Sequence, residues 1–265
     1  MTVTLCVVGA GNRGYRAYGE YLAAHPARVK VVAVAEPDPE KRERFSRGHG
    51  LPASGQFRSW EELLAGPRIA DAILIATPDR MHVAPALRAL DLGYHVLLEK
   101  PMATSPEECV SLVQGAERSG RLLMICHVLR YTPFFSRLKE LVASGRVGSV
   151  GTISLTENIG YWHFAHSYVR GNWGHASRAS PVILAKSCHD LDLLLWLAGA
   201  RVERLSSFGS LLHFRADQAP AGAPERCTDG CPREAACPFS APRFYLGQDT
   251  AWPVSVISVD TSLAA

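Results

Sequence analysis

The chain has 265 residues, of which 47% are hydrophobic and 20% charged, and its formal net charge is +3. This length suits one large domain or two modest ones, and we predict two. Because the net charge is small and the basic residues are scattered, the sequence argues against a nucleic-acid-binding protein, and no apolar run is long enough to span a membrane.

The seven cysteines are an odd number, and four of them stand singly in apolar or helical surroundings: Cys6, Cys109, Cys126 and Cys188. Such cysteines are typical of a reducing compartment rather than of a disulfide framework. The N-terminal MTVTLCVVGA lacks the basic and long apolar regions of a signal peptide and predicts a first strand. We therefore predict a cytoplasmic protein.

Short apolar runs alternate with helical periods through the first half of the chain. The predicted strands are 4–10, 29–36, 71–77, 94–100 and 121–127, and the predicted helices between them are 13–24, 38–47, 59–65, 80–92 and 106–119. Because parallel strands need a crossover between them, this alternation predicts an α/β fold with a doubly wound parallel sheet. We assign this Rossmann domain to residues 1–123.

The first strand ends in GAGNRG, which places Gly9, Gly11 and Gly14 in G-x-G-x-x-G spacing around Asn12 and Arg13. A strand before it and a helix after it are the context in which this pattern binds a dinucleotide. Glu36, at the end of the second strand, is placed to accept hydrogen bonds from the adenosine ribose and to repel a 2′-phosphate. The sequence therefore predicts NAD rather than NADP as the cofactor. The alternative is a structural glycine turn with Glu36 as a solvated strand end.

Glu99, Lys100 and Pro101 follow directly after the strand 94–100. Ligands of doubly wound sheets bind at the carboxyl ends of the strands, so Lys100 is predicted near the nicotinamide, where it can take part in proton transfer. Pro101 restricts the local backbone and so restricts where the lysine points. The alternative is an ordinary surface lysine.

The stretch IATPDRMHVAPALRALDLGYHVLLEKPMA, residues 75–103, resembles the Gfo/Idh/MocA family of NAD(P)-dependent oxidoreductases, whose signature joins T-P-x-x-x-H to a later E-K-P. With GAGNRG and CHDLDLLLWLAG (188–199), the resemblance extends to about residue 200. It implies a Rossmann domain followed by an α/β domain with an open, mainly antiparallel sheet, and redox chemistry at a hydroxyl carbon of sugars or polyols. It also implies that Lys100 is the active-site lysine, often in a cis peptide bond with the proline, and that Thr77, Pro78 and His82 line the cofactor. Glu99, Lys100 and Pro101, at the strand end, are likewise predicted to bind the cofactor.

We assign residues 124–265 to a second, substrate-binding and oligomerisation domain. The alternating pattern of 147–159 predicts a strand with one buried face. The stretch YWHFAHSYVRGNWGH (161–175) combines aromatic rings with hydrogen-bond donors, as a sugar-binding loop does, although an aromatic mini-core fits it equally well. The predicted substrate-binding residues are His127, Arg130, Tyr168, Arg170 and Trp173.

Residues 180–200 predict one capped helix, with Ser180 as N-cap, Pro181 in the first turn and Gly199 as the stop. Its polar face carries Lys186, His189 and Asp190. The family resemblance maps an active-site histidine onto His189. Many polyol-oxidising members have an aspartate four residues earlier, where this chain has Ala185. That departure makes Lys186 or Asp190 a candidate for part of a proton relay.

Cys227, Cys231 and Cys237 lie in C-x3-C-x5-C spacing. Three clustered cysteines can bind zinc or an iron–sulfur centre if a fourth ligand comes from elsewhere. A disulfide plus a free thiol, or three reduced thiols, is the alternative. The final stretch, VSVISVDTSLAA (254–265), predicts a strand, whereas members of this family continue further, so the chain is expected to be truncated or shortened.

Together these patterns predict an NAD-dependent dehydrogenase that moves hydride between nicotinamide and a secondary hydroxyl of a sugar, polyol or cyclitol. The catalytic candidates are Lys100, His189, Lys186 and Asp190. A glycosidase that oxidises its sugar transiently, and a non-catalytic dinucleotide-binding regulator, are the alternatives. A carbohydrate-like small molecule is the expected partner, without nucleic acid or membrane, and the chain is expected to form a homo-oligomer through the sheet of the second domain.

Overall fold

The computed structural model describes residues 2–175, 177, 179–246 and 254. The chain divides into two compact units, one of residues 1–155 and 176–199 and the other of residues 156–175 and 200–265. These bounds interleave along the sequence, and the division at residue 123 proposed above stays a prediction. Within the part of the chain that the structure describes, no helix is both long and apolar enough to cross a membrane.

The first unit contains a six-stranded, all-parallel sheet in the order β3-β2-β1-β4-β5-β6. This is the order of a Rossmann fold, so the predicted fold class is confirmed. The strands are β1 (Val3–Val8), β2 (Val29–Ala35), β3 (Gln56–Phe57), β4 (Ala72–Ile75), β5 (His95–Leu98) and β6 (Leu123–Ile125). Five of these match predicted strands. The short β3 was missed, because two residues are too few to show an alternating pattern.

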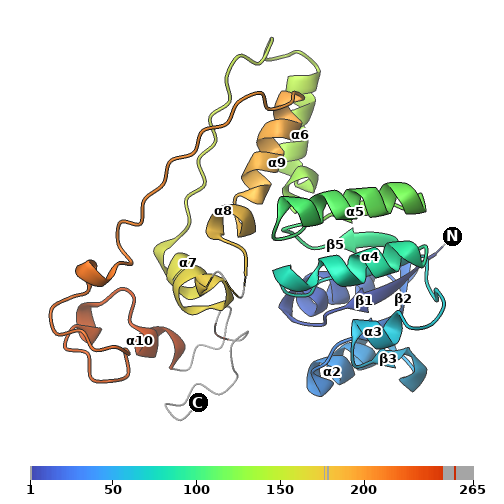
Figure 1. Ribbon diagram of the computed structural model, residues 1–265, viewed down its shortest axis with the longest axis horizontal. Coiled ribbons are helices and arrows are strands. Elements are labelled where there is room, and N and C mark those ends of the chain that lie inside the picture. Colours follow the sequence, from blue (N-terminus) through green and yellow to red (C-terminus); the bar gives the residue numbers. More distant parts are fainter. Residues whose placement is uncertain (1, 176, 178, 247–253, 255–265) are drawn as a thin grey trace. The chain divides into compact units, whose positions relative to one another are not determined.

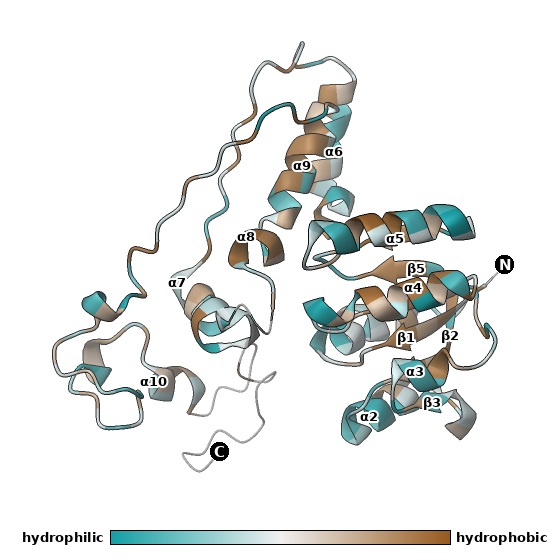
Figure 2. Cartoon of the chain, in the orientation of Figure 1, coloured by the Kyte–Doolittle hydropathy of each residue, from teal (hydrophilic) through white to brown (hydrophobic). Residues whose placement is uncertain are grey.

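Helices cover both faces of the sheet. On one face, α4 (Val83–Asp91) and α5 (Pro106–Ser119) lie side by side, with α3 (Trp60–Leu63), over a core that includes Ile73, Ile75 and Leu98 (Figure 1). On the other face, α1 (Glu20–Ala24) and α2 (Pro39–His49) cover Val7, Val34 and Leu74. Figure 2 shows the consequence, with apolar strands lying between helices that also carry hydrophilic residues.

Local sequence explains where the longer helices begin and end. Ser105 and Glu108 form a capping box at the start of α5, Pro106 occupies its first turn, and Gly120 ends it in the left-handed region at φ 62°. These signals satisfy the backbone groups that a helix terminus leaves unpaired. The helix therefore has the bounds that the sequence predicts.

The remainder of the chain departs from expectation at two places. The predicted helix 180–200 is two helices, α8 (Val182–Ala185) and α9 (Cys188–Ala198), and the N-cap of α8 is Pro181 rather than Ser180. Ser180 is instead buried and donates its hydroxyl to Asp79. Gly199 ends α9 in the left-handed region, as predicted.

The predicted strand at 147–159 is also wrong, because these residues form no strand. A strand is defined by hydrogen bonds to a neighbouring strand, and the only sheet formed among the described residues is the parallel one. The expected antiparallel sheet is therefore not seen in the described part of the chain, and oligomerisation through it stays a prediction. The predicted final strand lies outside the described residues except for Val254.

The other helices are α6 (Pro133–Ala143), in the first unit, and α7 (Tyr161–Phe164) and α10 (Ala241–Tyr245), in the second. The second unit has no strand among its described residues. Aromatic rings pack against one another there, including Phe214 against both Phe164 and Phe239, at centroid distances of 5.7 and 5.1 Å. This packing favours the aromatic mini-core interpretation of residues 161–175.

Candidate functional site

The carboxyl ends of the strands are level with one another. Val8 pairs with Ala35 and with Ile75, and Leu98 pairs with both Ile75 and Ile125. The residues that follow these five positions therefore emerge at one edge of the sheet: Gly9, Glu36, Ala76, Glu99 and Cys126. This edge, at the point where the strand order reverses between β1 and β4, is where doubly wound sheets bind ligands.

The glycine turn after β1 is packed too tightly for side chains at two of its positions. A Cβ on Gly14 would lie 1.9 Å from the Gly9 carbonyl oxygen, and one on Gly9, whose φ is 89°, would lie 2.8 Å from the Ala76 carbonyl oxygen. A Cβ on Gly11 would instead meet nothing within 4 Å. The turn thus presents bare backbone to open space at its middle glycine, next to the exposed Asn12 and Arg13. This arrangement fits a dinucleotide pyrophosphate.

Glu36 is buried and already serves the glycine turn. One carboxylate oxygen accepts a hydrogen bond of 2.7 Å from the Ala10 amide, and the other accepts one of 3.1 Å from the Asp38 amide. The side chain therefore ties the end of β2 to the glycine turn. Its predicted contact with the ribose would add to this structural role.

Glu99 connects the glycine turn to the lysine loop. Its Oε1 accepts hydrogen bonds from Arg13 Nε at 2.9 Å and from the Tyr18 hydroxyl at 2.7 Å, and its Oε2 accepts one from the Lys100 amide at 3.1 Å. Glu99 is 4% exposed, and its carboxylate forms an ion pair with Arg13. Glu99 thus orients the backbone from which Lys100 projects, rather than facing solvent.

His82 is buried between the loops after β4 and β5, and its predicted place beside the cofactor stays a prediction. It is 1% exposed, and its two ring nitrogens contact the Pro101 carbonyl oxygen at 2.8 Å and the Thr77 carbonyl oxygen at 2.9 Å. The ring therefore ties the loop after β4 to the cis Lys100–Pro101 peptide after β5.

Replacing His82 with alanine is expected to destabilise the fold, because the ring's contacts with the Pro101 and Thr77 carbonyl oxygens would be lost. The expected loss is about 1–3 kcal/mol for a buried carbonyl left unpaired. Urea unfolding measures it, with His25→Ala as the control, because the ring of His25 contacts a single carbonyl at an exposed position. A loss for His82→Ala no larger than the loss for the control would contradict the bridging role.

Lys100, His127 and His189 come together beside this loop. The Lys100 ammonium donates to the Ala185 carbonyl oxygen at the end of α8, at 2.9 Å. The rings of His127 and His189 contact each other edge to face, with centroids 5.7 Å apart. The Nδ1 atoms of both rings are buried and make no hydrogen bond in the structure.

The surroundings lower the pKa of both imidazoles and so favour their neutral forms. Burial is the main cause that lowers the pKa of His189 to about 4, with smaller contributions from Lys100, His127 and Lys186 and an opposing one from Glu99. Burial also lowers the pKa of His127, where Asp192 opposes the shift and Arg130 and Lys100 add to it. The site therefore offers one ammonium beside two neutral imidazoles that can accept a proton.

The break between α8 and α9 separates the two remaining catalytic candidates. Lys186 follows α8, and Asp190 lies in the first turn of α9. The two residues do not share one helical face with His189 as predicted, because Lys186 lies outside that helix. Lys186 still lies close enough to lower the pKa of His189. A proton relay through either residue stays a prediction.

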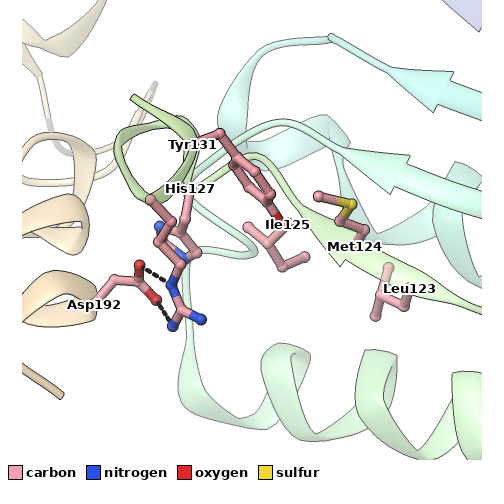
Figure 3. A pocket seen from close by; sticks show the side chains of 7 residues that line it. Leu123, Met124, Ile125, His127, Tyr131 and Asp192 are labelled. Atoms are coloured by element: carbon pink, nitrogen blue, oxygen red, sulfur yellow. Dashed lines mark hydrogen bonds and ion pairs between the residues drawn. The ribbon is translucent and has the colours of Figure 1, made fainter. Parts of the chain in front are cut away.

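Two carboxylates that the sequence did not single out position this region. Asp79 is buried and accepts hydrogen bonds from the Ser180 hydroxyl and amide, which ties the loop after β4 to the start of α8. Asp192 pairs with Arg130, and both line a pocket of about 290 Å³ along β6 and the turn that follows it (Figure 3). In the sequence, the only signals of these roles are that Asp79 follows a predicted strand and that Asp192 lies three residues after His189.

The other predicted substrate-binding residues belong to the second unit. Arg170 donates to the Phe239 carbonyl oxygen and lies 5.9 Å from the centre of the Tyr245 ring, and Tyr168 packs against Trp173 with centroids 6.2 Å apart. These contacts give each of the three side chains a place in the aromatic mini-core. Their contact with substrate stays a prediction.

The proposed metal site receives no support. Cys227, Cys231 and Cys237 are free and partly buried. Among the residues that the structure describes, no group of three or more histidine, cysteine, aspartate or glutamate side chains is arranged to hold a metal ion. Because all three are free, the structure agrees with the alternative of three reduced thiols.

Comparison with known proteins finds a matching family model and several relatives. Residues 3–127 match the family model GFO_IDH_MocA, described as an oxidoreductase family with an NAD-binding Rossmann fold. A 1-carboxy-3-chloro-3,4-dihydroxycyclohexa-1,5-diene dehydrogenase of Comamonas testosteroni is 33% identical over 181 residues, which cover 68% of this chain and 44% of that protein. Inositol 2-dehydrogenase 2 of Saccharopolyspora erythraea is 29% identical over 76% of this chain and 56% of its own length.

Solved structures give the same fold. The WlbA dehydrogenase of Bordetella pertussis, in complex with NADH and UDP-GlcNAcA, aligns with a TM-score of 0.62 at 25% identity, over 74% of this chain and 55% of that one. Scyllo-inositol dehydrogenase of Lactobacillus casei, with bound NAD(H) and scyllo-inositol, aligns with a TM-score of 0.63 at 21% identity, over 75% and 57%. This chain thus spans about half the length of the proteins that it matches.

Proposed function

We propose that this chain, whose residues 3–127 match the Gfo/Idh/MocA oxidoreductase family model, is an NAD-dependent dehydrogenase acting on a secondary hydroxyl of a sugar, polyol or cyclitol. The observation that carries this proposal is the convergence of Lys100, His127 and His189 at the carboxyl edge of the sheet that also carries the glycine turn. A bound nicotinamide would supply hydride acceptance there.

The side chains would do the rest of the chemistry. The Lys100 ammonium would stabilise negative charge that develops on the substrate oxygen, and such charge stabilisation in a partly buried site is a large catalytic effect. The neutral His189 imidazole would accept the hydroxyl proton, since its lowered pKa keeps it unprotonated at neutral pH. Glu99 and His82 would hold the backbone on either side of Lys100.

The substrate class is supported by the relatives rather than by the pocket alone. Two of the matched proteins are inositol dehydrogenases by name, and a third is crystallised with a nucleotide sugar acid. Since this chain spans about half of their lengths, we extend the carbohydrate-like class to it and no single substrate.

Incubation of the purified chain with NAD and a panel of inositols, aldoses and sugar acids tests the proposal through NADH absorbance at 340 nm. NADH is expected to form with at least one compound, and this formation is expected to be lost in the Lys100→Met variant. A chain that binds NAD and forms no NADH with any of the panel, while releasing an aglycone from a glycoside, would instead act as the transient-oxidation glycosidase.

Cofactor choice gives a second test. Wild-type protein is expected to bind NAD more tightly than NADP, and Glu36→Gln is expected to reduce that preference by roughly tenfold, because the ribose hydroxyls would lose a charged acceptor. Glutamine keeps the shape of the side chain, and its one acceptor oxygen can keep the hydrogen bond from the Ala10 amide that holds the glycine turn. Calorimetric titration with both nucleotides measures the ratio, with the exposed Glu40→Gln as control. Tighter binding of NADP by the wild type would overturn the assignment.

A further inference from the structure

Helix α9 meets the chain that follows β6 through a row of side-chain contacts. The turn Val128–Tyr131 and helix α6 provide one side, and α9 provides the other. The three pairs in the row are His127 with His189, Arg130 with Asp192, and Lys139 with Trp196.

The central pair has the geometry of a clamp. Arg130 Nε donates to Asp192 Oδ2 at 2.7 Å, and Arg130 Nη2 donates to Asp192 Oδ1 at 2.5 Å, as the dashed lines in Figure 3 show. The Asp192 side chain is 12% exposed and that of Arg130 is 36% exposed. Two parallel bonds to a planar guanidinium fix orientation as well as distance. This pair therefore restricts rotation of α9 more than a single contact could.

The spacing along α9 puts His189 on the same side of the helix as Asp192. His189, Asp192 and Trp196 are separated by three and four residues, so they lie along one stripe of the helix. Trp196 is held at the far end, where its carbonyl oxygen accepts from Lys139 at 2.5 Å and its ring lies 5.5 Å from the Arg130 guanidinium. Any slide or rotation of α9 that moves His189 must break the clamp.

At its first turn, α9 is joined to the preceding residues by backbone hydrogen bonds, from the His189 amide to the Lys186 carbonyl oxygen and from the Leu191 amide to the Ser187 carbonyl oxygen. The N-cap residue of α9, Ser187, makes no side-chain capping hydrogen bond. The Nδ1 atom of His189 also has no hydrogen-bond partner. The location of the His189 ring thus depends on the register of the helix that carries it.

We propose that Arg130 and Asp192 are positioning residues, whose bidentate pair sets the register of α9 and thereby holds His189 beside Lys100 and His127. The assignment rests on the proposed function only for the role of His189 in proton transfer. The clamp itself needs no substrate or cofactor.

The titration of His189, followed by NMR in the free protein, tests the proposal. The charged and titratable groups around the ring are Lys100, Glu99, His127 and Lys186. If α9 shifts, the ring gains water and loses these neighbours, and its pKa is expected to rise from about 4 toward the ordinary value of 6.5 in both Arg130→Ala and Asp192→Ala. A charge effect alone would act in opposite directions, because removing a cation raises the pKa of a nearby imidazole and removing an anion lowers it.

Matched variants complete the design. Arg137→Ala and Glu140→Ala break an exposed ion pair on α6, with a distance of 2.9 Å, and are expected to leave the titration unchanged. The exchanged pair Arg130→Asp with Asp192→Arg is expected to restore part of the wild-type value. Shifts of opposite sign in the two single variants, or no shift in folded protein, would overturn the proposal.

Turnover then separates this proposal from the proposed function. Arg130→Ala and Asp192→Ala are expected to lower kcat by roughly ten- to a hundredfold with NAD affinity unchanged, as small misplacements of reacting groups do. If the pKa of His189 rises in both single variants but the chain oxidises no carbohydrate, the positioning role of the clamp is supported and the proposed function is overturned. Reduced kcat without any change in the His189 titration would overturn the clamp alone.

Discussion

Replacement of Lys100 by methionine is expected to lower the rate of hydride transfer by roughly two to four orders of magnitude, the typical contribution of a positioned acid–base group. Methionine keeps the apolar stem and removes the ammonium, so charge that develops on the substrate oxygen would lose its stabilising partner. The affinity for NAD is expected to change little, because the contact strengthens only as that charge develops. Single-turnover absorbance and calorimetry measure the two quantities separately.

The hydrogen bond from Lys100 to the Ala185 carbonyl oxygen requires a structural control. Thermal unfolding of Lys100→Met shows whether the variant remains folded, and Lys30→Met, at an exposed position of β2, shows the effect of losing a surface lysine. Lys100→Arg is expected to restore little of the rate, since a guanidinium keeps the charge and does not release its proton near neutral pH. A folded Lys100→Met variant with more than about a tenth of the wild-type rate would contradict the mechanism.

Replacement of His189 by asparagine is expected to have a comparable effect on turnover, roughly two to four orders of magnitude, because the site would lose its neutral proton acceptor. The wild-type rate is expected to hold as the pH falls below 6.5 and to drop only near pH 4, where His189 becomes protonated. The asparagine variant is expected to lack that acid limb. The pH profile of kcat/KM, measured for both proteins, checks this result.

The lowered pKa of His189 also has a consequence for stability. The unfolded chain binds a proton at this residue near pH 6.5, whereas the folded chain does so only near pH 4, so the contribution of His189 to stability is full above pH 6.5 and is lost as the pH falls through this window. Lys100→Met removes one of the charges that lower this pKa. In that variant, the pH at which kcat/KM falls on the acid side is therefore expected to be higher than in the wild type. An acid limb of the wild type at an ordinary histidine pKa would contradict the assignment.

The parts of this protein that follow from its sequence are those in which cause and effect lie within a few residues. The glycine turn of residues 9–14, the capping box at Ser105 and the run of five strands were all predictable. Each depends on backbone freedom, on a cap three residues away or on a short apolar run. The sequence also located Lys100 and His189, through a strand end and a family resemblance.

Only the tertiary structure decided how these pieces act together. Glu36 with Ala10, Glu99 with Arg13, and Asp79 with Ser180 are separated by 26, 86 and 101 residues, and no periodicity in a sequence encodes such pairs. The break between α8 and α9 was not predictable either, because residues 180–200 carry a continuous helical pattern and the Ser180 side chain bonds Asp79 rather than capping the helix. The clamp of Arg130 on Asp192 likewise joins charges 62 residues apart. Local chemistry selected the elements, but the site arises where the sheet brings its strand ends level, since only packing in three dimensions makes such distant groups neighbours.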